Sequence, residues 1–193
     1  MYETSQGWYE KTFFHTPKEN TRISLCFDGV YMDCTLFVNR QEAGSWQYGY
    51  TSFEFEISDF LVAGENTILL RVTYESPNSR WYTGAGIYRS VWIRECPLIH
   101  FIPDSIYIST VKENGCYELI ISHELSQPEQ GAVVHTLLNQ EGRELLTGIS
   151  SGQKVRIPDP VLWSPEKPYL YTLRSEVICD LIIRHITRHI LTG

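Results

Sequence analysis

The sequence contains 193 residues, of which 42% are hydrophobic and 13% aromatic, and its formal net charge is −7. This composition suits one or two globular domains with a buried core, and the negative charge argues against binding to nucleic acid. No run reaches the roughly 20 apolar residues that a transmembrane helix requires, and the first residues lack the features of a signal peptide. We therefore expect no nucleic-acid or membrane partner. The five cysteines form no CxxC pair, and the reduced thiols that this predicts favour a cytoplasmic location.

The first half of the chain predicts short β-strands separated by turns. Apolar and polar residues alternate in runs at residues 23–27, 32–38, 53–57, 68–72 and 87–94. Residues 7–16 form an aromatic run that we expect to be a buried strand, and residues 58–61 fit a single helical turn. Short strands at this spacing, without a long amphipathic helix, predict an all-β sandwich.

The second half predicts another sandwich after a boundary at residues 95–103, where two Xaa-Pro pairs enclose a short apolar link. Its expected strands lie at residues 106–111, 117–123, 132–139, 154–157 and 169–178. This pattern fits an immunoglobulin-like domain. Residues 180–193 differ, because their apolar residues recur at a spacing closer to a helix than to a strand. His185 and His189 would share one face of such a helix, but no third ligand is near, so we expect no metal site.

The five cysteines, Cys26, Cys34, Cys96, Cys116 and Cys179, are odd in number and form no CxxC pair. This spacing fits neither a disulfide framework nor a zinc site. We expect reduced, mostly buried thiols, and neither a metal nor an organic cofactor.

Residues 80–89 (RWYTGAGIYR) combine aromatic rings, arginines and two glycines between two expected strands. Aromatic faces and nearby donors suit a sugar ring, but the same residues could form a loop that only packs two strands together. Trp46 and Tyr48 leave the same two interpretations open, stacking on a sugar or packing in the core. Glu54 and Glu56 alternate with apolar residues, so we place them on the exposed face of a strand.

Several motifs occur together in a fixed order in this sequence. They are GWYEKTF at 7–13, FDGV at 27–30, VNRQ at 38–41, GSWQYGYTSF at 44–53, GENT at 64–67, WYTGAGIYR at 81–89 and LWSPEKPYLY at 162–171. In this order they resemble the first two domains of glycoside hydrolase family 2, which includes β-galactosidases, β-glucuronidases and β-mannosidases.

The resemblance implies a jelly-roll, sugar-binding-type domain at residues 1–97, an immunoglobulin-like domain at 103–179 and an atypical tail at 180–193. It also implies a catalytic (β/α)₈ barrel, in which two glutamates about 5 Å apart hydrolyse the glycoside with retention. Such a barrel needs about 200 residues or more, and none is present here. We therefore assign no catalytic residues and expect this chain to be inactive alone.

By the same resemblance, Asn78, Arg80 and Trp81 lie in a loop directed toward the substrate pocket, and Trp46 is a further candidate for carbohydrate contact. Gly84, Gly86 and Arg89 then have structural roles. A β-glycoside is expected as a partner only together with the barrel. The alternatives are a free-standing carbohydrate-binding β-sandwich and a purely structural pair of sandwiches.

The resemblance also implies additional residues before the strand at 7–13. Without them, a jelly roll has an unpaired edge or an uncovered apolar face. Either the C-terminal residues or a second copy of the chain could cover it, and we expect a homodimer.

Overall fold

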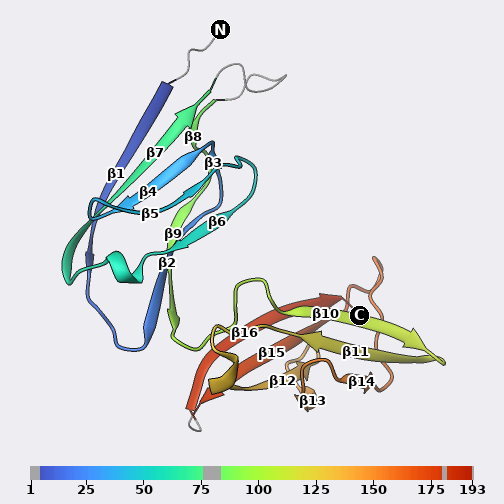
Figure 1. The fold of residues 1–193 in the computed structure, drawn as a ribbon. Coiled ribbons are helices and arrows are strands. Elements are labelled where there is room, and N and C mark those ends of the chain that lie inside the picture. The colour runs from blue at the N-terminus through green and yellow to red at the C-terminus, as the bar shows by residue number, and fades with distance from the viewer. Residues whose placement is uncertain (1–4, 76–83, 180–181, 193) are drawn as a thin grey trace. The chain divides into compact units, whose positions relative to one another are not determined.

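The computed structural model describes residues 5–75, 84–179 and 182–192, and the chain divides into two compact units, Met1–Cys96 and Pro97–Gly193 (Figure 1). The division falls inside the boundary expected from the sequence. Each unit has its own hydrophobic core, so each is described by itself.

The first unit is built from strands β1 to β9 and one short 3₁₀ helix, η1 at Ser58–Phe60. The strands are β1 (Ser5–His15), β2 (Thr21–Phe27), β3 (Val30–Tyr31), β4 (Cys34–Val38), β5 (Gln41–Trp46), β6 (Phe53–Glu56), β7 (Gly64–Tyr74), β8 (Gly86–Ile87) and β9 (Val91–Pro97). They form a sheet of order β1-β7-β4-β5, a sheet of order β6-β2-β9 and the short pair β3-β8.

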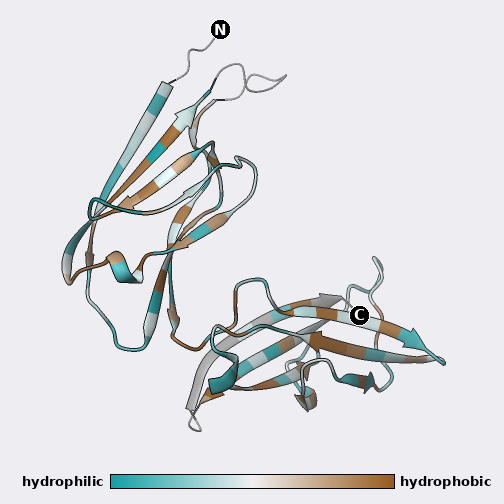
Figure 2. Ribbon diagram, viewed as in Figure 1, coloured by the Kyte–Doolittle hydropathy of each residue, from teal (hydrophilic) through white to brown (hydrophobic). Residues whose placement is uncertain are grey.

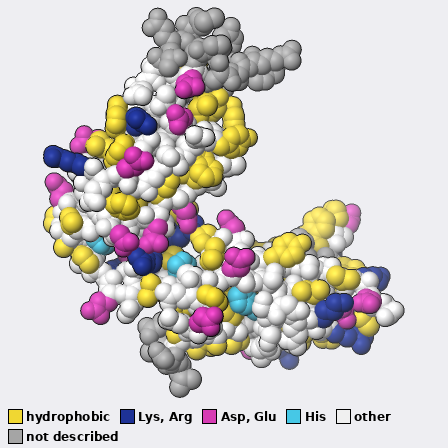
Figure 3. Space-filling model, in the orientation of Figure 1, with side chains coloured by type: hydrophobic (Ala, Val, Ile, Leu, Met, Phe, Trp, Pro, Cys, Tyr) yellow, Lys and Arg dark blue, Asp and Glu magenta, His cyan; other side chains and the backbone are white. Residues whose placement is uncertain are grey.

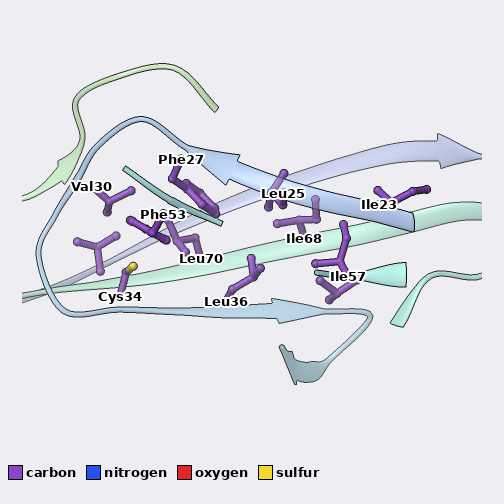
Figure 4. Close-up of a cluster of buried hydrophobic side chains, with 12 residues drawn as sticks. Ile23, Leu25, Phe27, Val30, Cys34, Leu36, Phe53, Ile57, Ile68 and Leu70 are labelled. Carbon is purple, nitrogen blue, oxygen red and sulfur yellow. The ribbon is translucent and has the colours of Figure 1, made fainter. Parts of the chain in front are cut away.

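The core of the first unit lies between these sheets (Figure 4). Leu25 and Phe27 of β2 meet Leu36 of β4 and Leu70 of β7, and all four side chains are almost fully buried. Along β7 the buried and partly exposed residues alternate as the sequence predicted, and Figure 2 shows hydrophobic residues along this strand interrupted by hydrophilic ones. The period of two places one apolar face of each sheet against the other.

Two asparagine side chains hold the turns at one end of this sandwich. Asn66 is fully buried; its amide nitrogen donates to the carbonyl oxygens of Val62 (2.8 Å) and Gly64 (3.0 Å), and its oxygen accepts from the Val62 N–H. Asn39 donates to the same Asn66 oxygen at 2.7 Å and accepts from the Thr67 N–H at 3.0 Å. Every polar atom of the buried amide therefore has a partner, which gives the VNRQ and GENT motifs a structural reason.

The expectation of a buried strand at residues 7–16 is wrong. β1 is exposed along most of its length, and Phe14 is 80% exposed. The reason is its position, because β1 pairs with β7 on one side and is the end strand of its sheet. The sequence pattern also missed β5, which follows β4 through the turn at Asn39 and Arg40, both with positive φ.

The second unit is a sandwich of strands β10 to β16 with one short 3₁₀ helix, η2 at Pro128–Gln130. The strands are β10 (Tyr107–Glu113), β11 (Cys116–Ser122), β12 (Ala132–Leu138), β13 (Glu144–Ile149), β14 (Lys154–Ile157), β15 (Leu170–Cys179) and β16 (Ile182–Thr192). They form sheets of order β10-β11-β14 and β13-β12-β15-β16. Leu119 and Ile121 from the first sheet pack with Leu137 and Leu173 from the second, which is the arrangement expected of an immunoglobulin-like core.

The helical spacing expected for residues 180–193 is wrong, because β16 is a strand of the second unit's sheet. It pairs antiparallel with β15 at ten positions, from Leu170↔Thr192 to Cys179↔Ile182. The register shifts between Val177 and Ile178, and Arg184 on β16 is passed over. This bulge moves the following residues by one position, so the apolar residues lose the period of two that marks a strand. The residues of β16 therefore complete this sheet of the second unit.

Candidate carbohydrate site

An aromatic cleft lies at the β3–β8 end of the first unit. It has a volume of about 340 Å³ and is lined by Tyr9, Tyr31, Tyr50, Tyr88 and residues 84–87. In Figure 3, hydrophobic side chains, a class that includes tyrosine and is drawn in yellow, gather at this end of the unit. Clefts of this size lined by aromatic rings and a few polar groups are typical of small-ligand sites.

Three of the tyrosine rings lie directly against glycine backbone. A Cβ atom added to Gly49 would lie 2.3 Å from the Tyr31 ring, and one added to Gly29 would lie 2.6 Å from the Tyr88 ring. Gly86, at φ +136°, would place a Cβ atom 2.5 Å from the Tyr9 hydroxyl. Only glycine permits these approaches, so the walls of the cleft depend on residues that carry no side chain of their own.

Hydrogen bonds and ring contacts fix the same tyrosines. The Tyr88 hydroxyl donates to the carbonyl oxygen of Gly49 at 2.7 Å, and the Tyr9 hydroxyl accepts from the Ile87 N–H at 3.3 Å. Tyr50 meets Tyr31 edge to face at 5.2 Å between ring centroids. The hydrogen bond with the Tyr31 side chain raises the pKa of Tyr50.

Trp46, the candidate from the sequence, is the last residue of β5 and does not line the cleft. Its ring stacks on Phe53 at 5.3 Å with an interplanar angle of 15°, and Phe53 in turn stacks on Phe27. The stacking on Phe53 supports the packing interpretation for one side of the Trp46 ring. The side chain as a whole is still 36% exposed. The other candidates, Asn78, Arg80 and Trp81, lie outside the described residues.

The sequence analysis missed Tyr9, Tyr31 and Tyr50 as a group, because they come from distant parts of the chain. The available signal was the set of glycines at 29, 49 and 86, each next to or near an aromatic residue. Gly86 has the structural role expected of it, and Arg89 contacts the ring of Tyr88, with its guanidinium carbon 5.5 Å from the centroid.

Three carboxylates of the first unit, those of Asp28, Glu54 and Glu56, have partners among the described residues. Glu54 and Glu56 are exposed, as predicted, and form ion pairs with Arg94 (2.7 Å) and Arg22 (3.1 Å). Asp28 accepts a hydrogen bond from the indole N–H of Trp92 at 3.0 Å. No carboxylate is among the described residues that line the aromatic cleft.

The cysteines are all free thiols, and Cys26, Cys34 and Cys179 are buried. Burial, with a hydrogen bond from Cys26 to Glu54, raises the pKa of Cys26 to about 12, and burial raises the pKa of Cys34 to about 11. Protonated thiols of this kind are poor nucleophiles and poor metal ligands. In the part of the chain that the structure describes, no group of three or more His, Cys, Asp and Glu could hold a metal ion. No helix within the same residues is long and apolar enough to cross a membrane.

β-Sandwiches of the jelly-roll type occur among lectin domains, and a cleft lined by aromatic rings suits a small ligand. Family models identify the group. Residues 2–97 match the model of the glycosyl hydrolases family 2 sugar-binding domain, and residues 108–188 match a second model of glycosyl hydrolases family 2. The chain belongs to glycosyl hydrolase family 2. The second match includes most of β16, in agreement with its place in the sheet.

Individual relatives agree with the family assignment. The chain is 35% identical over 191 residues to beta-galactosidase BoGH2A of Bacteroides ovatus, covering 89% of this chain and 22% of the relative. It is 34% identical over 184 residues to a putative beta-glucuronidase of Formosa agariphila, covering 89% of this chain and 18% of the relative. The crystal structure of a beta-glycosidase from Bacteroides vulgatus matches with a TM-score of 0.83 and 28% identity, over 97% of this chain and 26% of that one. The chain thus spans about a fifth of the curated relatives it matches.

Proposed function

We propose that this chain is the non-catalytic N-terminal portion of a retaining family 2 glycoside hydrolase, most like a β-galactosidase. The observation that carries the proposal is the tandem match to the family's sugar-binding domain and to its second domain. The relative with 35% identity is a beta-galactosidase, and this chain covers 22% of its length.

The chemistry of the described residues supports a role without catalysis. Retaining hydrolysis requires a nucleophilic carboxylate and an acid/base carboxylate about 5 Å apart across the glycosidic bond. The described lining of the cleft consists of tyrosine, glycine, alanine and isoleucine. These residues can bind and orient a sugar, but they include neither of the two carboxylates, so the reacting groups would come from a barrel elsewhere in the protein.

The tyrosine cleft would shape one side of the substrate pocket. Tyrosine rings offer an apolar face to a sugar ring, and their hydroxyls exchange hydrogen bonds with its hydroxyl groups. Residues 84–87 line the cleft, and residues 76–83, with Asn78, Arg80 and Trp81, precede them directly in the sequence. Held in place by Gly29, Gly49 and Gly86, the rings would lose little conformational freedom when a ligand binds.

Hydrolysis assays test this function. The purified chain should give no turnover of aryl β-galactoside or aryl β-glucuronide above a heat-denatured control. Turnover by the chain that is lost on heating would overturn the assignment of a non-catalytic role.

A free-standing carbohydrate-binding module is the second candidate, favoured by the exposure of Tyr9, Tyr50 and Tyr88 in the cleft. Calorimetric titration with methyl β-galactoside separates the two functions. A site completed by another domain should bind no tighter than about 1 mM, whereas a complete module should bind near 1 µM, a difference of about 4 kcal/mol.

A further inference from the structure

An apolar groove runs along the open side of the first unit, between β1 and β9. Its volume is about 550 Å³, and Glu10 and Lys11 are the charged residues in its described lining. The apolar lining comprises Tyr9, Phe13, Leu25, Phe27, Ile68, Leu70, Ile87, Val91, Trp92 and Ile93. Leu25, Phe27, Ile68 and Leu70 belong to the buried core, so the groove reaches into the space between the two sheets.

Both strands that border the groove are end strands. β1 ends the sheet of order β1-β7-β4-β5, and β9 ends the sheet of order β6-β2-β9. An end strand presents a row of backbone N–H and C=O groups that another strand can pair with. Soluble proteins usually protect such an edge with charged residues, proline or a bulge.

β9 lacks that protection in its first half. Val91, Trp92 and Ile93 are consecutive and between 41% and 46% exposed, although neighbouring residues of a strand point to opposite faces. Val91 and Ile93 therefore leave apolar side chains uncovered on one face of this open strand. Trp92 lies on the other face, where its indole N–H donates to Asp28 at 3.0 Å and the Arg94 guanidinium lies 5.0 Å from its ring centroid. Charges come only further along, at Arg94 and Glu95.

We propose that a second copy of this chain covers the groove, with β9 pairing antiparallel with β9 of the other copy about a two-fold axis. In an antiparallel pairing about a two-fold axis, the numbers of two residues that lie opposite each other always add up to the same value. With Trp92 opposite its own copy, Val91 lies opposite Ile93. Arg89 precedes the first residue of β9 by two positions and would extend the pairing to Glu95. Each of these pairs forms twice.

The pairing is complementary in both polarity and charge, which is what distinguishes a self-matching edge. Apolar residues meet apolar ones, and directly opposite side chains of unlike charge stabilise an antiparallel pair. Glu95 pairs with Lys18 at 2.7 Å but keeps 39% of its side chain exposed, so it can accept a second cation. The result is a continuous sheet across the dimer and an isologous interface, the commonest form of homodimer.

The mass in solution tests the proposal, measured by light scattering after size-exclusion chromatography at tens of micromolar. The wild-type chain should have twice its 22.4 kDa mass. A monomeric wild type overturns the proposal by itself, whatever the variants do, and it would leave the groove to a segment outside residues 1–193. The family role does not depend on this outcome.

A matched pair of variants locates the interface. Val91→Lys introduces a charge into the groove edge and should give a monomer. Val111→Lys is the control, since Val111 is also 41% exposed and lies on β10, an end strand of the second unit. Circular dichroism should show that both variants fold. Pairing through β9 is contradicted if the Val91→Lys variant remains a dimer. It is also contradicted if the Val111→Lys variant loses the dimer to the same extent.

Discussion

The backbone of Gly49 lies against the ring of Tyr31 so closely that a Cβ atom at position 49 would be 2.3 Å from Cδ2 of the ring. The carbonyl oxygen of the same glycine accepts the hydroxyl proton of Tyr88 at 2.7 Å. One residue without a side chain thus positions two walls of the tyrosine cleft. The shape of the candidate site therefore depends on glycines as much as on the rings that would touch a ligand.

Gly49→Ala should displace the Tyr31 ring and destabilise the first unit by about 1–3 kcal/mol, the range for overpacking a well-packed site. Urea unfolding followed by tryptophan fluorescence measures the change. Gly7→Ala is the control, because a Cβ atom there meets nothing within 4 Å. Equal stability of the Gly49→Ala variant and the wild type would show that the ring is free to move away.

Asn66→Ala should lower the free energy of unfolding by about 2–4 kcal/mol, because the Asn39 amide and the backbone of Val62 would lose their partners in a buried place. The same denaturant titration measures the loss. Glu65→Ala, at the exposed neighbouring position of β7, should change stability by less than about 0.5 kcal/mol. Similar effects of the two substitutions would contradict the role given to the amide network.

The second unit should lose stability in mild acid because of His135. This side chain is fully buried, 2.7 Å from the Ser175 hydroxyl and 3.0 Å from His123. Burial, with smaller effects of His123 and His189, lowers the pKa of His135 from 6.5 to about 4. The unfolded chain then binds more protons than the folded one between these values.

The sign of the effect follows from this difference in protons. The contribution of His135 is complete above pH 6.5 and is lost as the pH falls toward 4, by roughly 2–3 kcal/mol. Denaturant titrations at several pH values give the free energy of unfolding as a function of pH. Its slope should be smaller for His135→Asn than for the wild type, and comparing the two proteins cancels the contribution of the carboxylates that both contain. Identical slopes would mean that His135 does not titrate between these states.

Truncation after Cys179 should selectively destabilise the second unit, since it removes β16 and leaves the edge of β15 open at ten positions. Differential scanning calorimetry should then show one transition lowered or lost and the other retained. An unchanged thermogram would contradict the place of β16 in the sheet.

The sequence was informative where one face of a strand is buried without interruption. Ile23, Leu25 and Phe27 on β2, and Ile68, Leu70 and Val72 on β7, show the period of two because their sheets pack on a single core. The immunoglobulin-like arrangement of the second half was predictable for the same reason.

Interrupted registers explain what the sequence did not indicate. The pairings of β5 with β4, β13 with β12 and β16 with β15 all contain a register shift, which breaks the alternation of apolar residues. The tyrosine cleft could not be predicted either, because Tyr9, Tyr31, Tyr50 and Tyr88 meet only after the sandwich has folded. Exposure of β1 depends likewise on its end position and not on its composition.

The central claim is that these two sandwiches belong to a longer family 2 glycoside hydrolase. Sequencing the coding region on both sides of residues 1–193 in the source genome tests it most directly. We expect the codons downstream, in any reading frame, to encode a (β/α)₈ barrel with a glutamate following an asparagine. Flanking sequence that encodes no such barrel in any frame would contradict the claim.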